Sequence, residues 1–234
     1  MKNFLPSAVV VLSSLLGFSS ELRAMVVTGV TIESVSSQLT TGDGGFPRGA
    51  DQIVDGSGLS GGLHSTIADG TMWDADTFSP PFTSTGTDTD PQVTFDLGSA
   101  VIVGSFEVWN YGDRGFSGSP IFSGTPFTQR GVKNFEVFAS LDNVGYSSIG
   151  TFALAEAPGG SSPYAGEVIA PTSFLARYVR FDIIDNHADD FAFGVGLSEV
   201  QFTAVPEPSG VGLLSMVAVF TCCLRRRWRS ESTS

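Results

Sequence analysis

The chain has 234 residues and a formal net charge of −12, from 24 acidic and 12 basic residues. Three of the acids and six of the bases lie outside residues 25–205, so this segment holds 21 acids against six bases. Such a surface repels phosphates and excludes a nucleic-acid-binding protein; its acidity serves either solubility or calcium binding. The 28 glycines and 19 phenylalanines favour strands joined by turns around an apolar core and exclude a disordered chain.

Residues 1–24 have the features of a secretory signal peptide. Lys2 precedes an apolar run over residues 4–18, and Ala24 ends an imperfect cleavage site. A buried first helix is the alternative, but the run contains Pro6 and lacks a polar face. We therefore expect the protein to be exported.

Short runs of alternating apolar and polar residues recur through the middle of the chain. They occupy residues 26–35, 93–98, 102–111, 132–140, 146–154, 175–184 and 197–203. In the run over 175–184, Val179, Phe181 and Ile183 share one face, as in a half-buried strand. No run shows a convincing helical stripe. The pattern predicts an antiparallel β-sandwich or jelly roll, with the first run at an edge.

Five short motifs follow one another in this region. They are IVDG at 53–56, VTFDLG at 93–98, WNY at 109–111 followed by RGVK at 130–133, RYVRF at 177–181 and GLSEVQF at 196–202. Across residues 51–202 this order resembles the discoidin-like, or coagulation-factor C-type, galactose-binding domain. The resemblance implies an eight-stranded jelly roll over residues 25–204 that binds ligands, often glycans, at loops on one end. Gln92 and Val93 stand where the family usually has tryptophan, so glycan specificity does not carry over.

The same resemblance implies a structural calcium ion. Asp55 and Glu199 stand at the matching positions, and Ser57 and nearby carbonyl groups are further candidate ligands. Calcium takes six to eight oxygens, which carboxylates and loop carbonyls supply. The alternative is that Asp55 makes a turn hydrogen bond and Glu199 a surface contact.

Aromatic and polar residues suited to sugars form a second candidate site. Rings stack on the CH-rich face of a sugar, and arginine or asparagine bonds its hydroxyl groups. The candidate ligand contacts are His64, Trp109, Asn110, Tyr111, Arg130 and Asn186. If the strands flanking the 18-residue loop 112–129 form a hairpin, Tyr111 and Arg130 meet at one rim. The alternatives are that the aromatic rings pack beneath the loop, and that Arg130 pairs with an acid such as Asp113.

Signals for catalysis are poor. The sequence GLSGG at 58–62 matches the nucleophile-elbow pattern, but that motif needs a strand before it and a helix after it. His64 and His187 are the only histidines. We expect the acid pairs Asp74/Asp76 and Asp189/Asp190 to be solvated loop residues. We therefore expect a protein that is not an enzyme.

The C-terminus combines three features in a fixed order. The motif Pro206, Glu207, Pro208 precedes an apolar run at 209–224, and then come Arg225, Arg226, Arg227 and a polar tail at 230–234. Residues 205–229 resemble the PEP-CTERM sorting signal of certain Gram-negative bacteria. The resemblance implies a transmembrane helix at 209–224, cleavage by an exosortase, and association with exopolysaccharide at the cell surface. The arginines would keep the helix end cytoplasmic and leave the domain outside. A terminal helix packed on the domain is the alternative.

Together these features predict an exported, non-catalytic binding protein, held transiently in the inner membrane and then placed at the cell surface or in the matrix. Its expected partner is extracellular polysaccharide. The alternative partner is a surface protein, in a structural or adhesion role without a sugar site. A glycan-active hydrolase is the third reading, for which the sequence supplies no catalytic group.

Overall fold

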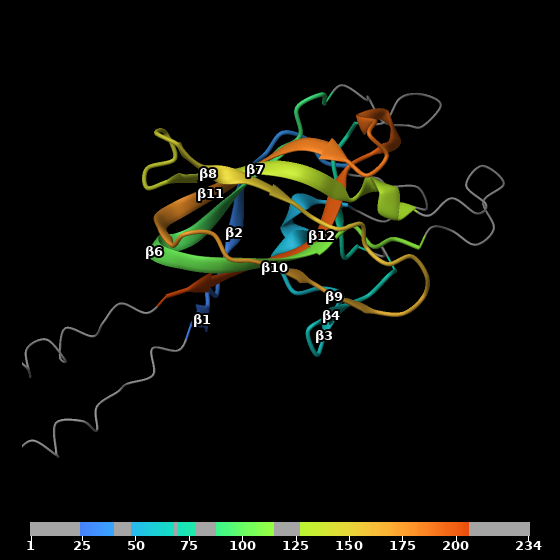
Figure 1. Cartoon of the computed structure of the whole chain (residues 1–234), viewed down its shortest axis with the longest axis horizontal. Helices are drawn as coiled ribbons and strands as arrows, with labels where there is room; N and C mark the ends of the chain where they lie inside the picture. The colour runs from blue at the N-terminus through green and yellow to red at the C-terminus, as the bar shows by residue number, and fades with distance from the viewer. Residues whose placement is uncertain (1–23, 40–47, 68–69, 78–87, 115–126, 206–234) are drawn as a thin grey trace, which may run out of the picture. The chain divides into compact units, whose positions relative to one another are not determined.

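The computed structural model describes residues 24–39, 48–67, 70–77, 88–114 and 127–205 (Figure 1). Residues 24–205 form one compact unit. The predicted signal peptide, apart from Ala24, and the sorting motif with its apolar run lie outside the described residues. Helical structure in the described ranges consists of short 3-10 turns, and none of them is long and apolar enough to cross a membrane.

Strands build the domain. In chain order, the described elements are β1 (Met25–Val26), β2 (Thr31–Val35), η1 (Ala50–Ile53), β3 (Leu59–Ser60), β4 (Leu63–His64), β5 (Trp73–Asp74), β6 (Gln92–Asn110), η2 (Phe127–Arg130), β7 (Val132–Ser140), β8 (Ser147–Ala153), β9 (Tyr164–Ala165), β10 (Glu167–Ile169), β11 (Phe174–Asn186), η3 (Phe191–Phe193) and β12 (Gly196–Ala204). The main path of hydrogen-bonded strands runs β1-β12-β6-β11-β7-β8, and β3, β4 and β9 form a separate small sheet.

Strand β6 belongs to both layers of the sandwich. Residues 93–98 and 102–111, predicted as two strands, belong to one continuous strand of 19 residues, except for Tyr111, which follows its end. Its first half pairs with β2 and β11, and its second half with β12 and β10. The register with β11 shifts near Gly98, which has a φ of +79° that suits glycine. A bulge at a glycine bends a strand without ending it. In the sequence alone, Gly98 predicts the end of the first strand, because glycine is also typical of turns.

The hairpin that would bring Tyr111 and Arg130 together across loop 112–129 does not form. Strand β11 lies between β6 and β7 and pairs with both, antiparallel (Figure 1). Sequence neighbours are therefore separated by a strand that comes later in the chain. Pairing depends on which apolar faces meet in three dimensions, and the loop is long enough to permit either arrangement.

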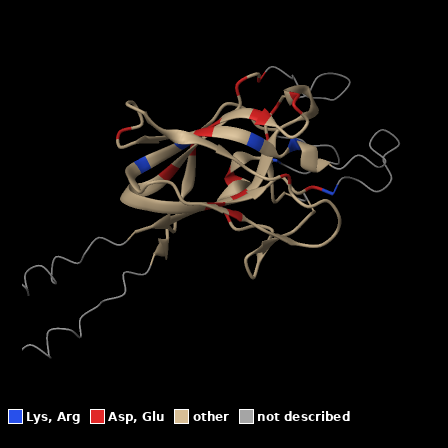
Figure 2. Ribbon diagram, in the orientation of Figure 1, with Lys and Arg blue, Asp and Glu red and all other residues tan. Residues whose placement is uncertain are grey.

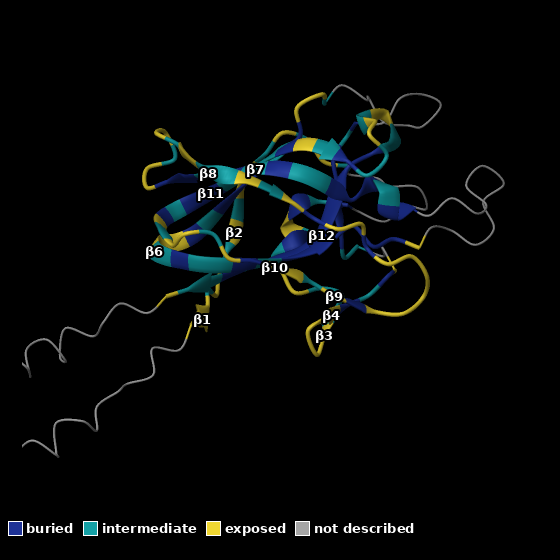
Figure 3. Ribbon diagram, in the orientation of Figure 1, coloured by how far each residue is buried: buried dark blue, intermediate teal, exposed yellow. Residues whose placement is uncertain are grey.

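The core lies between the two layers and is rich in phenylalanine (Figure 3). Phe95, Phe106, Phe135, Phe181 and Phe202 are at most 1% exposed. Phe181 lies 4.9 Å from Phe135 and 5.1 Å from Phe95 between ring centroids, in tilted or edge-to-face contact. Such aromatic pairs contribute about 0.5–1.5 kcal/mol beyond the burial of their area. The predicted apolar face of residues 175–184 is confirmed, because Val179, Phe181 and Ile183 all lie in this core.

Candidate functional site

The three predicted calcium ligands come together at the turn after η1. Asp55 accepts a hydrogen bond from the Ser57 backbone N–H at 2.7 Å, as the turn alternative predicted. Glu199, on β12, is 1% exposed and so makes no surface contact. Its carboxylate reaches this turn, because the Gly56 N–H hydrogen-bonds it.

The oxygens at this turn are candidate cation ligands, although the described residues contain no group of three His, Cys, Asp or Glu side chains that could hold a metal ion. Among the described residues, the buried Oε2 of Glu199 and Oγ of Ser57 have no hydrogen-bond partner. Burial, reinforced by the nearby Asp55 carboxylate, raises the pKa of Glu199 to about 8 despite the Gly56 hydrogen bond. Buried oxygens without partners are costly, and a cation that takes oxygen ligands would satisfy them.

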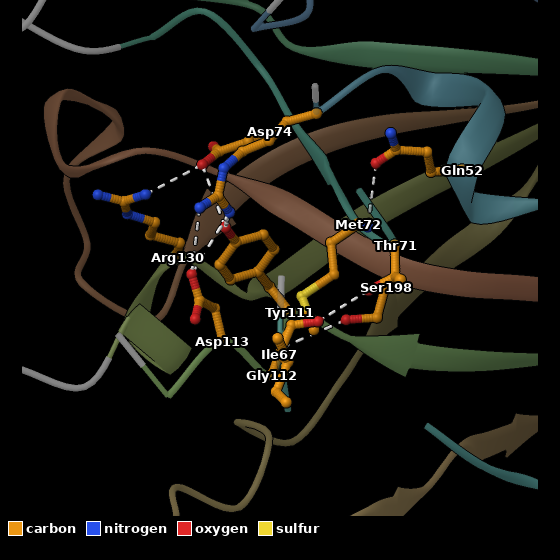
Figure 4. A network of polar contacts seen from close by, with 11 residues as sticks. Gln52, Ile67, Thr71, Met72, Asp74, Tyr111, Gly112, Asp113, Arg130 and Ser198 are labelled. Atoms are coloured by element: carbon orange, nitrogen blue, oxygen red, sulfur yellow. Dashed lines mark hydrogen bonds and ion pairs between the residues drawn. The ribbon is translucent and has the colours of Figure 1, made fainter. Parts of the chain in front are cut away.

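A network of buried charges lies where several loops leave the sheets (Figure 4). We call it the loop-base network, and its members are Arg48, Asp74, Tyr111, Asp113 and Arg130. Arg130 Nη1 lies 3.0 Å from Asp74 Oδ2, and Arg48 Nη2 lies 3.3 Å from Asp113 Oδ2. Arg48 also donates to the Tyr111 hydroxyl, which donates to Asp74 at 3.4 Å. Arg48 precedes η1, Asp74 lies on β5, Tyr111 and Asp113 follow β6, and Arg130 ends η2. The network therefore connects four segments of the chain.

Burial dominates the electrostatics of this network. Asp74 is fully buried, and its Oδ1 has no hydrogen-bond partner among the described residues. Burial therefore raises the pKa of Asp74 to about 6, although the Arg130 and Arg48 guanidinium groups oppose the shift. Burial likewise raises the pKa of the Tyr111 hydroxyl, which keeps the phenol neutral and able to donate.

The expectation of an exposed aromatic platform beside Arg130 is wrong. Tyr111 and Arg130 are 0% and 3% exposed, and the Arg130 guanidinium lies 4.1 Å from the Phe127 ring centroid. Trp109 is 1% exposed, packs with Ala157 and Tyr164, and donates to the Gly62 carbonyl at 3.3 Å. The two predicted aromatic rings therefore pack inside the domain, each in a small cluster separate from the phenylalanine core.

The other three predicted contact residues hold loops in place. Asn110 donates to the carbonyl oxygens of Val132 and Ala155 at 2.7 and 2.8 Å. Asn186 donates to those of Asp190 and Gly194 at 2.8 and 2.7 Å. His64 is fully buried, its Nδ1 lies 2.7 Å from the Ser65 carbonyl, and burial lowers its pKa. Direct contact between any of these side chains and a ligand stays a prediction.

Sequence reasoning missed Arg48 and assigned Asp74 and Asp113 other surroundings or partners than the structure gives them. Asp74, predicted to be a solvated loop residue, is the buried partner of Arg130, and Asp113 pairs with Arg48 instead. The sequence signal that could have indicated a buried Asp74 is its place between two apolar residues, Trp73 and Ala75, which are both fully buried in the structure. The GLSGG segment forms the β3–β4 hairpin with an exposed Ser60, so it lacks the context of a nucleophile elbow.

Acidic residues outnumber basic residues in the described part of the domain (Figure 2). The described residues contain 19 Asp and Glu against six Lys and Arg. Four of these six bases form ion pairs with aspartates inside the domain, and they are Arg48, Arg130, Lys133 and Arg177. Since most positive charge is neutralised internally, the field around the domain favours neutral or cationic partners.

A scan of protein-family models and a search of curated proteins found no match to this sequence. Solved structures do match. The C-terminal domain of a chitobiase from Bacteroides fragilis aligns with a TM-score of 0.50 and 19% identity, over 79% of this chain and 100% of that one. CBM32-3, from a family 31 glycoside hydrolase of Clostridium perfringens, aligns with a TM-score of 0.50 and 15% identity, over 77% and 94%. The likeness establishes the fold: the domain is an all-β, discoidin-like jelly-roll sandwich, as the sequence predicted.

Proposed function

We infer that this protein is a non-catalytic carbohydrate-binding protein that works outside the cytoplasm. The observation that carries the inference is the loop-base network on a discoidin-like jelly roll. Two buried Arg–Asp pairs hold the starts and ends of loops on one fixed scaffold. Rigid support of loops by a β-sandwich is how such folds present binding surfaces, and it reduces the entropy that a ligand must overcome.

The acidic surface narrows the class of ligand. Polysaccharides that carry carboxylate or sulfate groups are repelled by a domain with 19 acids and six bases among its described residues. Neutral and amino polysaccharides meet no such barrier. The proposed ligand is therefore a neutral or amino glycan of the extracellular matrix.

Binding of the full chain to a glycan array tests this function. The array should include neutral, amino and uronic acid glycans at physiological salt. Selective binding to neutral or amino glycans supports the proposal. Binding only to acidic glycans, or to none while the protein binds a surface protein partner, overturns it in favour of another class of ligand or an adhesion role.

A structural calcium ion is a second part of the proposal. Asp55, Ser57 and Glu199 would hold the ion, and carbonyl groups of the same turn would complete its ligands. The ion would neutralise the buried Glu199 carboxylate and tie β12 to the turn after η1. Its role would be to stabilise the domain, since it brings no reactive group to the ligand.

Export and sorting are the third part, supported by the sequence of both ends. The protein would lose residues 1–24 on export and its arginine-rich end on cleavage near the motif at 206–208 by an exosortase. Mass spectrometry of the protein extracted from the cell surface should find neither segment. A surface protein that retains residues 225–229 would contradict sorting by this route.

A further inference from the structure

A small pocket opens beside the connection from β8 to β9. Its volume is about 180 Å³. It is lined by Val108 and Asn110 of β6, by residues 154–158, and by residues 164–167 around β9 and β10. The exposed residues Ala155, Pro158 and Ala165 and the nearly buried Val108, Leu154 and Ala157 supply apolar walls, and the described lining carboxylates are Glu156 and Glu167.

The side chains of the described lining residues have no unused hydrogen-bond donor. Both N–H groups of the Asn110 amide are already bonded, to Val132 and Ala155. The Tyr164 hydroxyl donates to the Asn110 carbonyl at 2.5 Å. A neutral acceptor or an anion would therefore find no side-chain partner among the lining residues.

The same lining still offers acceptors. One oxygen of Glu156 accepts from the Thr128 hydroxyl at 2.6 Å, and one oxygen of Glu167 accepts from the Ala155 N–H at 3.0 Å. The second oxygen of each carboxylate has no hydrogen-bond partner among the described residues. Glu156 and Glu167 are exposed, and one hydrogen bond fixes one oxygen of each carboxylate. The other oxygen of each is therefore accessible to a ligand.

The charge and the apolar walls of the pocket favour one kind of hydrogen-bond donor on a ligand. None of the described lining residues is a lysine or arginine, and acidic residues outnumber basic ones in the described part of the domain. An ammonium group donates three hydrogen bonds and carries the complementary charge. Apolar walls suit the carbon skeleton attached to that group, whereas a bare calcium ion prefers six to eight oxygens.

We propose that this pocket binds the protonated amino group of an amino sugar, with Glu156 and Glu167 as its acceptors. The proposal rests on the carbohydrate-binding function inferred above and specifies its ligand class. The apolar walls contact the ring carbons, and acetylation of the amine removes both the charge and two of its donors. The pocket therefore distinguishes free amino sugars from their N-acetylated forms.

Titration calorimetry of the full chain with glucosamine oligosaccharides and with the matching N-acetylglucosamine oligosaccharides tests the proposal. We expect the free amine to bind at least tenfold more tightly and to lose affinity as salt is added. Glu167→Gln and Glu156→Gln should each weaken binding about tenfold. Glutamine retains the oxygen that accepts from the Ala155 N–H or the Thr128 hydroxyl, so both variants should melt like the wild type. The matched control is Glu33→Gln, an exposed carboxylate on β2, which should bind like the wild type.

The outcomes separate this proposal from the broader function. Equal affinity for the amine and its N-acetylated form, or unchanged affinity of both pocket variants, overturns the pocket and leaves carbohydrate binding standing. Loss of amine binding in Glu33→Gln as well would show a general charge effect and overturn the pocket. Absence of binding to every oligosaccharide and to free glucosamine overturns the pocket, and an empty glycan array overturns the broader function with it.

Discussion

Removal of the Arg130 side chain should destabilise the domain severely. The Arg130 guanidinium lies 3.0 Å from the Asp74 carboxylate, and the two side chains are 3% and 0% exposed. Breaking a buried pair by deleting one partner costs about 3–5 kcal/mol, because the remaining charge stays buried. For a domain of this size, that loss lowers the melting temperature by roughly 6–20 °C.

Arg177→Ala is the matched control. Arg177 forms two hydrogen bonds with Asp96, at 3.1 and 3.0 Å, but these side chains are 42% and 14% exposed. Water solvates the Asp96 carboxylate when the arginine is gone, so the expected cost is below about 1 kcal/mol. Both substitutions delete an arginine from an Arg–Asp pair, and they differ mainly in burial.

The dependence on pH adds a second measurement. Because the pKa of Asp74 is raised from 3.8 to about 6 in the folded state, this group stabilises the fold as the pH falls below about 6, and the contribution is lost as the pH rises through 6. Without Arg130 the pKa of Asp74 rises further. Protonation then removes a charge that only Arg48 and the Tyr111 hydroxyl still stabilise, so the destabilisation by Arg130→Ala should be largest at pH 8 and smaller at pH 5.

Urea unfolding of both variants at pH 8 and pH 5, followed by tryptophan fluorescence, measures these effects. The reasoning is refuted if Arg130→Ala unfolds within about 1 kcal/mol of the wild type at pH 8. It is also refuted if Arg177→Ala costs as much as Arg130→Ala.

Two further predictions concern the calcium ligands and the packed tryptophan. Calcium at 100 times its Kd would stabilise the folded state by about 2.7 kcal/mol. Chelation should remove this stabilisation and lower the melting temperature of the wild type. Glu199→Gln should remove this response. Because the pKa of Glu199 is raised to about 8, its carboxylate is charged and buried at pH 9, so the same substitution should stabilise the calcium-free protein at that pH. Identical melting of the wild type in chelator and in calcium would argue against the site. Trp109→Ala should cost about 3–5 kcal/mol in urea unfolding, since its ring is 1% exposed, and an unchanged midpoint would show that the ring is not packed.

Local patterns in the sequence located the longer strands, but not the short strands β3, β4, β5, β9 and β10. The alternation over 132–140 predicted β7 (Val132–Ser140), and that over 175–184 predicted most of β11 (Phe174–Asn186). Alternation is a local property, because successive side chains of a strand point to opposite faces and only one face here is apolar. The partners of these strands were not predictable in the same way, and the wrong hairpin between β6 and β7 shows why. Pairing of β11 with both depends on contacts between residues far apart in the chain.

The loop-base network shows where the sequence by itself reaches its limit. The sequence determined the all-β class and the approximate positions of the longer strands. Only the tertiary structure decided that the partner of Arg130 is Asp74, 56 residues away, rather than Asp113. Pairing of β5 with β12 fixes Asp74 on the sheet, and the apolar residues on either side of it carry it into the interior. A buried charge takes the partner that the fold places within hydrogen-bonding distance, and that distance is a property of the packed sheets.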